Sequence, residues 1–240
     1  MLGQSGLART IVVAASADSA PTTRMRCAIS AMRVAEHFRD RGMHVLLFVD
    51  SLTRFSEAQR EVAVSAGEFP SLRGFPPSTP SQMTALLERA GPSDTGAITA
   101  VCTVLVAASD MHEPVADMLR GILDGHVLLD RKIADQGRFP AVNVLQSVSR
   151  CLPDLAEPKE VETIAQARRL IATYDAASGL IESGLYASGS DVDVDRAIAF
   201  RKAFIEFSTI RANCELPESF EALRLCIRRS ESTKEARSRP

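Results

Sequence analysis

The most regular apolar segment of the chain is a run of five residues, Val45 to Val49, without polar alternation. Such a run predicts a strand that is buried on both faces of a parallel sheet flanked by helices. The run ends at a carboxylate, Asp50. In open α/β sheets, ligands bind beyond the carboxyl ends of the strands. We therefore expect Asp50 at the rim of the sheet where a ligand would bind.

Strand and helix patterns alternate before and after this run. Ile11 to Ala15 predicts a first strand, and apolar positions recurring every three or four residues predict a helix over 23–41 that Gly42 ends. With the Val45–Val49 strand, these elements would form a β-α-β unit with parallel pairing. Helices are also predicted over 56–66 and 81–89, on either side of a loop over 67–80 that contains four prolines and two glycines.

The alternation continues to about residue 150 and then changes to helix alone. Further strands are predicted over 97–107, 126–129 and 142–145, and further helices over 114–123, 133–136, 161–178, 194–212 and 217–229. A parallel α/β core is the most economical fold for the first part. We therefore predict an α/β domain over 1–152, a small all-helical domain over 153–229 and a disordered tail over 230–240, where apolar residues are almost absent.

The composition excludes several classes of function. The 240 residues are 45% hydrophobic and 24% charged, with a net charge of −2, which is typical of a globular chain of one or two domains. Acids and bases are interleaved, so no surface for nucleic acid or anionic lipid is predicted. The absence of a membrane-length apolar run and of a signal pattern predicts a cytoplasmic location. Five widely spaced cysteines indicate reduced structural thiols rather than a zinc site.

An ordered series of short motifs runs through the α/β part. The motifs are Asp50-Ser51-Leu52-Thr53-Arg54-Phe55, Ala58-Gln59-Arg60-Glu61, Gly74-Phe75-Pro76-Pro77-Ser78, Ile122-Leu123-Asp124-Gly125-His126, and Phe139-Pro140-Ala141-Val142 through Ser147-Val148-Ser149-Arg150. Together they closely resemble the catalytic ATPase of type III secretion systems and flagellar export, a relative of the catalytic subunit of F-type ATP synthases. The resemblance covers about residues 6–229 and implies a RecA-like parallel sheet with flanking helices.

The resemblance also implies roles for four residues. Asp50 matches the Walker B carboxylate, which holds Mg²⁺ directly or through water, and Arg54 lies in the same segment near the phosphates. Phe139 matches the aromatic residue that packs against the adenine base. Arg150 matches the arginine finger, which reaches into a neighbouring subunit's site and neutralises charge that develops on the γ-phosphate. The implied cofactors are ATP and Mg²⁺.

The family resemblance further implies an assembly and its partners. The expected assembly is a homohexameric ring with nucleotide at each interface. The expected partners are secretion stalk and export-chaperone proteins, and the ring would associate with a membrane export apparatus only peripherally. Nucleic acid is not an expected partner.

The chain departs from the family pattern in two respects. No Gly-x-x-x-x-Gly-Lys-[Ser/Thr] occurs, and no Lys follows the nearest glycine-rich stretch, Gly3 to Gly6. In the family, the phosphate loop, the strand leading into it and the carboxylate that activates water all precede the position of Met1. We therefore expect the chain to resemble a C-terminal half whose sheet lacks the phosphate-loop strand. In addition, Val106 to Asp110 replaces a segment that is usually acidic.

The same residues also have simpler structural explanations. Asp50 can cap a strand end, Arg54 can be a surface cation, Phe139 can be buried at a domain junction, and Arg150 can be a charge at a helix end. Two other functions also stay open. The first is an RNA-translocating helicase, because transcription-termination helicases share an Asp-Ser-x-Thr-Arg segment. The second is a non-catalytic interaction module related to the ATPases, which the missing phosphate loop favours.

Overall fold

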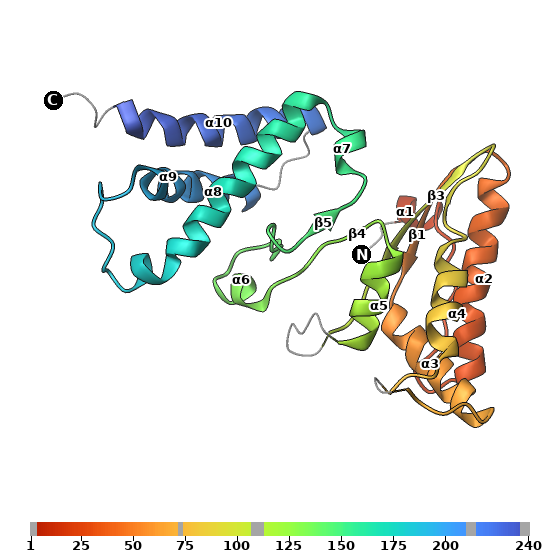
Figure 1. Cartoon of the computed structure of the whole chain (residues 1–240). Helices are drawn as coiled ribbons and strands as arrows, with labels where there is room; N and C mark the ends of the chain where they lie inside the picture. Colours follow the sequence, from red (N-terminus) through yellow and green to blue (C-terminus); the bar gives the residue numbers. More distant parts are fainter. Residues whose placement is uncertain (1–3, 72–73, 107–112, 210–214, 236–240) are drawn as a thin grey trace. The chain divides into compact units, whose positions relative to one another are not determined.

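The computed structural model describes residues 4–71, 74–106, 113–209 and 215–235 (Figure 1). The chain divides into two compact units, Met1–Leu123 and Asp124–Pro240. Each unit has its own hydrophobic core. No helix among the described residues is long and apolar enough to cross a membrane.

A three-stranded sheet forms the centre of the first unit. Strand β1 (His44–Val49) pairs in parallel with β3 (Ala97–Cys102), and β2 (Gly91–Pro92) pairs with the start of β3 in the antiparallel direction. The predicted α/β class with parallel pairing is therefore confirmed. The order β1-β3-β2 leaves β1 with a neighbouring strand on one side only among the described residues.

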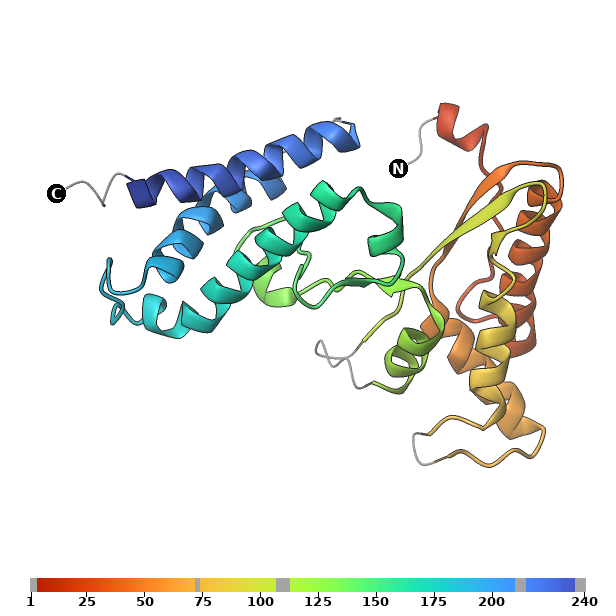
Figure 2. The same cartoon turned by 45° about the horizontal axis from the view of Figure 1, so that its top comes forward.

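In the described part of the first unit, five helices are present. They are α1 (Gln4–Leu7), α2 (Pro21–Arg39), α3 (Leu52–Ser65), α4 (Ser78–Leu87) and α5 (Pro114–Ile122). Helix α2 packs against α3 and runs along β1, which Figures 1 and 2 both show. The core is formed mainly by large apolar side chains of these helices, among them Met32, Leu52, Phe55, Met83 and Leu119.

Strand β1 is buried on one face only. Its side chains alternate, because Val45, Leu47 and Val49 pack against the core, whereas Leu46 is 58% exposed and Phe48 is 68% exposed. Val101 of β3, the register partner of Phe48, is also exposed. The prediction of a strand buried on both faces is therefore wrong, because the described helices of the unit cover only one face of the sheet.

The predicted strand over Ile11–Ala15 does not form. Residues 10–16 have no regular secondary structure, and Val12 is 72% exposed. The Cys27 thiol donates a hydrogen bond to the Val13 carbonyl oxygen over 3.4 Å. A strand needs a ladder of backbone partners on a neighbouring strand, and the apolar character of the segment cannot supply that ladder.

The second unit consists mainly of helices. It contains β4 (Gly125–His126), α6 (Arg131–Asp135), β5 (Val148–Ser149), α7 (Leu152–Leu155), α8 (Pro158–Glu182), α9 (Val192–Thr209) and α10 (Leu216–Glu235). Helix α9 packs against both α8 and α10 around a core that includes Ile171, Phe200, Phe204 and Ile227. The three predicted C-terminal helices are confirmed, although part of the segment predicted as 194–212 lies outside the described residues.

The parallel sheet does not continue into the second unit. Strands β4 and β5 pair in the antiparallel direction. Of the segments predicted as strands over 126–129 and 142–145, His126 belongs to β4, and Leu129 forms an isolated antiparallel bridge with Val142. The prediction of parallel strands in this part is therefore wrong. The short segments pair with each other rather than with β1 or β3.

The boundary between the two compact units lies between Leu123 and Asp124, whereas the predicted domain boundary is at 152/153. Arg168 of α8 donates hydrogen bonds to the carbonyl oxygens of Val144, Leu145 and Ser147. The side chains of Val144 and Leu145 also pack against the helical core. These contacts attach the segment 124–150 to the helices, and nothing in the hydrophobic pattern indicates them.

The C-terminal helix is longer than predicted. Helix α10 continues to Glu235, so the prediction of a disordered tail is wrong for residues 230–235, and 236–240 lie outside the described residues. Ser230 is only 1% exposed, and Glu231 forms an ion pair with Arg196 of α9. Packing against α9 therefore stabilises a stretch that its polar composition does not indicate.

Candidate functional site

The carboxylate of Asp50 lies directly beyond the last residue of β1. The parallel register continues past the strand ends, because the Thr103 amide donates to the Val49 carbonyl oxygen at 2.9 Å and the Leu52 amide donates to the Thr103 carbonyl oxygen at 3.0 Å. The Thr103 hydroxyl also donates to Oδ1 of Asp50 at 2.7 Å. Asp50 and Thr103 therefore lie side by side at the carboxyl edge of the sheet, where ligands bind in this class of fold.

This corner of the sheet suits a magnesium–phosphate ligand better than a protein-bound metal. Within the described residues, no group of three or more His, Cys, Asp or Glu side chains could hold a metal ion. The Asp50 side chain is exposed, and no hydrogen-bond partner is found for its Oδ2 among those residues. A single carboxylate is the usual protein contribution to a Mg²⁺ ion that takes its other ligands from water and phosphates. The donor set therefore fits Mg²⁺ bound together with a nucleotide.

Helix α3 begins immediately after this carboxylate. Ser51 caps the helix, because its side-chain oxygen accepts a hydrogen bond from the Arg54 amide at 3.4 Å. Leu52 is fully buried and Phe55 is 5% exposed, so the first turn is anchored in the core. The cap explains why the helix begins at Leu52, four residues before the predicted start at Ser56.

The Arg54 side chain extends from this anchored turn into solvent. It is 66% exposed, and its Nη1 lies 3.0 Å from Oε2 of Glu57 on the same helix. Opposite charges three residues apart on an exposed helix face contribute little to stability. Arg54 therefore lies in the first turn of α3, four residues after Asp50. Its exposed guanidinium group is available to bind a phosphate.

A buried thiol follows on the neighbouring strand. Cys102, the register partner of Val49, precedes Thr103, and burial raises the pKa of its thiol to about 11. The thiol therefore stays protonated at neutral pH, and a protonated thiol is a poor nucleophile. Cys102 packs against the core of the first unit.

Phe139 belongs to the second unit and is exposed. It follows α6, its side chain is 64% exposed, and the Phe139–Pro140 peptide bond is cis. The next residue but one, Ala141, is buried, and its carbonyl oxygen accepts a hydrogen bond from the Asp130 amide at 2.8 Å. Within this unit, the Phe139 side chain is therefore not buried in a core. An exposed ring on an anchored backbone is instead available to stack against a flat ligand.

Arg150 also belongs to the second unit, directly after β5. Its amide donates a hydrogen bond to the Asp124 carbonyl oxygen at 2.8 Å, and its side chain is exposed. It precedes the short helix α7. The structure therefore brings Asp50 and Arg54 together on one strand–helix corner of the first unit, and it places Phe139 and Arg150 on anchored backbone segments of the second.

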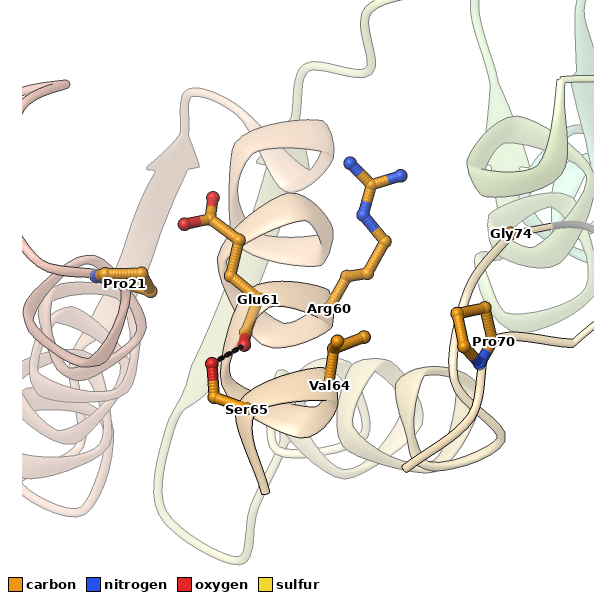
Figure 3. A pocket seen from close by; sticks show the side chains of 7 residues that line it. All are labelled: Pro21, Arg60, Glu61, Val64, Ser65, Pro70 and Gly74. Carbon is orange, nitrogen blue, oxygen red and sulfur yellow. Dashed lines mark hydrogen bonds between the residues drawn. The ribbon is translucent and has the colours of Figure 1, made fainter. Parts of the chain in front are cut away.

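A shallow hollow of about 510 Å³ in the first unit is not part of this corner (Figure 3). It lies between the end of α3 and the loop that follows. Its charged groups have partners: Glu61 pairs with Arg24 at 2.8 Å, and the Arg60 guanidinium lies 5.2 Å from the centre of the Phe75 ring. Glu61 therefore has an ion-pair partner and Arg60 an aromatic partner, as is common on a solvated or interface face.

Sequence reasoning missed Thr103. Its hydroxyl is the hydrogen-bond donor closest to the candidate carboxylate, and a threonine directly after an apolar strand was the only signal. Of the segment 106–110, which replaces a usually acidic stretch, residues 107–110 lie outside the described residues.

The chain matches two family models. Residues 1–149 match the ATP synthase alpha/beta family, nucleotide-binding domain, and residues 156–224 match the T3SS EscN ATPase C-terminal domain. A flagellum-specific ATP synthase of Bacillus subtilis is 45% identical over 206 residues, which cover 86% of this chain and 47% of that protein. The chain spans about half the length of the curated relatives that it matches.

Solved structures show the same similarity. The assembled ATPase EscN of the enteropathogenic E. coli type III secretion system matches with a TM-score of 0.89 and 37% identity, over 94% of this chain and 55% of that one. EscN in complex with its central stalk EscO matches with a TM-score of 0.84 and 38% identity, over 94% of this chain and 54% of that one. The chain therefore belongs to the ATP synthase alpha/beta nucleotide-binding family, in the group that has the C-terminal domain of the type III secretion ATPase EscN.

Proposed function

We propose that this chain contributes the magnesium-binding carboxylate and the arginine finger of an ATPase that drives protein export through a type III secretion or flagellar apparatus. The observation that carries the proposal is the Asp50 carboxylate, held by Thr103 at the carboxyl edge of a parallel strand pair. Family membership and the flagellar and secretion relatives support it.

In this proposal, Asp50 and Arg54 act on the nucleotide from one side. A Mg²⁺ ion bound at this corner would supply positive charge next to the phosphates of the nucleotide. Asp50 holds the ion or one of its waters, while the Thr103 hydroxyl fixes the orientation of the carboxylate. Arg54 has an exposed guanidinium that can move from Glu57 to a phosphate oxygen.

Phe139 and Arg150 act in two different sites of the assembly. The exposed Phe139 ring packs against the adenine base of its own subunit's nucleotide. Arg150 reaches into the site of a neighbouring subunit, where a planar guanidinium that is always charged stabilises the transferring phosphoryl group. Because Arg150 acts in the site of a neighbouring subunit, several subunits must assemble, and we propose a ring of six identical subunits.

The proposed partners follow from the relatives. EscN has been solved in complex with its central stalk EscO. For this chain we propose a stalk protein and export chaperones as partners, and a cytoplasmic location with only peripheral attachment to the membrane export apparatus. The net charge of −2 does not favour nucleic acid as a ligand.

Hydrolysis in this proposal needs polypeptide beyond these 240 residues. No Gly-x-x-x-x-Gly-Lys-[Ser/Thr] occurs in them. The backbone N–H groups and the lysine of such a loop hold the β- and γ-phosphates, and a single carboxylate with Mg²⁺ cannot replace them. The functional ATPase therefore joins these residues to a segment that carries the loop.

A chimera tests the proposal. The N-terminal part of the Bacillus subtilis flagellum-specific ATP synthase would be fused to this chain, so that the fusion has the length of the relative. We expect ATP hydrolysis that Asp50→Ala abolishes. We expect Arg150→Ala to leave nucleotide binding intact and to lower kcat by about three orders of magnitude, the usual contribution of an arginine finger. Arg131→Ala, which changes a highly exposed arginine of the same unit, is the matched control.

Mixing variants then tests whether the finger acts between subunits. Asp50→Ala and Arg150→Ala subunits are each inactive alone, but a mixed ring contains interfaces at which both intact residues meet. We expect mixing to restore part of the activity. Mixed rings that stay as inactive as either parent variant contradict the assignment of Arg150.

The missing phosphate loop also favours a second function, that of a non-catalytic interaction module. Under that alternative, the chimera binds stalk or chaperone proteins but has no activity that depends on Asp50. The helicase alternative is tested in the same assay, because RNA stimulates turnover by an RNA translocase. We expect RNA to leave turnover by the chimera unchanged.

A further inference from the structure

A tight turn over residues 143–147 has hydrogen-bond donors at five successive carbonyl oxygens. The Asn143 carbonyl accepts from the Ser147 amide at 3.0 Å and from the Ser147 hydroxyl at 2.7 Å. The Gln146 carbonyl oxygen lies 2.8 Å from Nε2 of His126. The other three carbonyls, of residues 144, 145 and 147, accept from a single side chain, Arg168. All five carbonyl oxygens therefore have a partner, and one guanidinium supplies it for three of them.

Arg168 reaches this turn from helix α8. Its Nη1 donates to the carbonyl oxygens of Val144 at 2.6 Å and Ser147 at 3.3 Å, and its Nη2 donates to that of Leu145 at 2.9 Å. The side chains of Val144 and Leu145 pack against the core to which α8 contributes. The guanidinium reaches the three carbonyls from two nitrogens held in a fixed plane, whereas a lysine ammonium would have to reach them from a single nitrogen.

The turn leads directly into the segment that carries Arg150. Strand β5 pairs with β4, with Ser149 opposite Gly125 and Val148 opposite His126. A side chain at Gly125 would collide with the Val148 carbonyl oxygen, so the two strands are in close contact. The Arg150 amide then donates to the Asp124 carbonyl oxygen. Residues 148–150 are thus held by β4 on one side and follow, without a flexible link, from the turn that Arg168 holds.

We propose that Arg168 is a positioning residue for Arg150, an inference that rests on the proposed role of Arg150 as the arginine finger. Arg168 fixes the turn from which the finger extends. It thereby connects the finger to α8, the first long helix of the segment that matches the EscN C-terminal domain. A partner that displaces α8 in an assembled ring would consequently change the position of the finger.

Hydrogen exchange on the 240-residue chain tests the attachment without reference to ATP hydrolysis. In Arg168→Lys, we expect exchange across residues 144–150 to rise at least about tenfold, because one ammonium nitrogen cannot reproduce the bonds that two guanidinium nitrogens make to the turn. Protection in α9 and α10 should stay unchanged and shows that the helical core is folded. Arg169→Lys, which alters the exposed neighbour on the same helix, is the matched control. Unchanged exchange across 144–150 in Arg168→Lys overturns the proposal.

A chemical rescue separates positioning from general damage to the fold. In Arg168→Ala, a guanidinium ion added at a concentration too low to denature should reoccupy the carbonyl site and restore protection across 144–150. Potassium ion at the same concentration should not, because it lacks the planar donors. Equal effects of the two ions contradict a specific guanidinium site.

Turnover by the chimera tests the connection to Arg150. A small displacement of a catalytic group can cost about 10²-fold in rate, so we expect Arg168→Lys to lower kcat by about that factor and to leave KM for ATP unchanged. Faster exchange with an unchanged kcat overturns the link between Arg168 and the finger. If Arg150→Ala is inactive while Arg168→Lys changes neither exchange nor kcat, the positioning role is overturned and the proposed function stands. If Arg150→Ala itself keeps full activity, the proposed function fails instead.

Discussion

The Thr103 hydroxyl donates a hydrogen bond to Oδ1 of Asp50 over 2.7 Å, at the point where β3 and β1 both end. The Thr103 amide and carbonyl are bonded to Val49 and Leu52 on either side of that carboxylate. Thr103 is thus tied to the β1–α3 corner by three hydrogen bonds. Its side chain determines which oxygen of Asp50 is left for a ligand.

Replacing Thr103 by valine removes this hydrogen bond and keeps the shape of the side chain. A hydrogen bond to a charged group contributes about 1.5–3 kcal/mol, so we expect turnover by the chimera to fall roughly 10- to 100-fold and to need more Mg²⁺. The measurement is kcat as a function of Mg²⁺ concentration. Thr103→Ser keeps the hydroxyl and is expected to stay close to wild type, and a serine variant as impaired as the valine variant contradicts this role.

The 240-residue chain by itself is expected to have no appreciable ATPase activity. It contains Asp50 and Arg150 but no loop that could hold the β- and γ-phosphates. The measurement is phosphate release by purified protein, with Asp50→Ala as a control for contaminating enzymes. Hydrolysis by the purified chain that disappears in Asp50→Ala contradicts the expectation.

The exposed face of β1 is expected to cause self-association. Leu46 is 58% exposed and Phe48 is 68% exposed, on a strand that has a neighbour on one side only among the described residues. Burial of such side chains contributes about 1.5–3 kcal/mol each, so Leu46→Thr with Phe48→Thr should weaken association at least about tenfold. Light scattering across a concentration series measures this.

A second exposed leucine provides the control for that experiment. Leu185 is 75% exposed in the loop after α8, so Leu185→Thr should leave association unchanged. Hydrogen exchange gives an independent check. A monomer with strong protection across Val45–Val49 would show that β1 is already covered in solution.

The ion pair between Glu36 and Arg89 is expected to make stability depend on pH. Arg89 donates two hydrogen bonds to the Glu36 carboxylate, at 2.7 and 2.8 Å, and these bonds hold the pKa of Glu36 below its ordinary value of 4.5. A carboxyl group whose pKa is lowered by folding stabilises the fold at pH values above its ordinary pKa. The contribution is lost as pH falls through the lower pKa of the folded state.

Glu36→Gln should therefore lower the free energy of unfolding by about 1–2 kcal/mol at pH 7, because both partners are largely shielded from solvent. The difference between variant and wild type should disappear in acid. Urea unfolding at several pH values measures it, with Asp135→Asn as the control in a highly exposed pair. A difference that stays the same from pH 7 down to the most acidic pH at which the chain still folds would mean that the lost stability is not electrostatic.

The pattern of apolar residues predicted those helices and strands that depend on residues close together in the sequence. The Val45–Val49 strand, the helix that begins at Pro21 and the three C-terminal helices were found close to where their periodicity placed them. The carboxyl-edge position of Asp50 also followed from the strand that precedes it. These features depend on residues near one another in the sequence.

Features that depend on distant partners were not predictable in the same way. Ile11–Ala15 has the composition of a strand but lacks a paired neighbour, and the Thr103–Asp50 hydrogen bond joins residues of two different strands. Arg168 attaches the segment 124–150 to the helical unit by hydrogen bonds to backbone carbonyl groups. Every residue has such a group, so the sequence does not indicate which ones Arg168 binds. Helix α10 continues to Glu235 through a polar stretch, in which Ser230 is buried and Glu231 pairs with Arg196 of α9.

Leu46 and Phe48 lie on the exposed face of β1, and the exposed Asp50 follows one residue beyond the end of the strand. A polypeptide segment that shields the two apolar side chains would therefore end close to the carboxylate. Covering this face would lower the local dielectric around Asp50 and strengthen its attraction for a cation. The affinity of the proposed site for Mg²⁺ would then be thermodynamically linked to the docking of that segment, so each would stabilise the other by the same free energy.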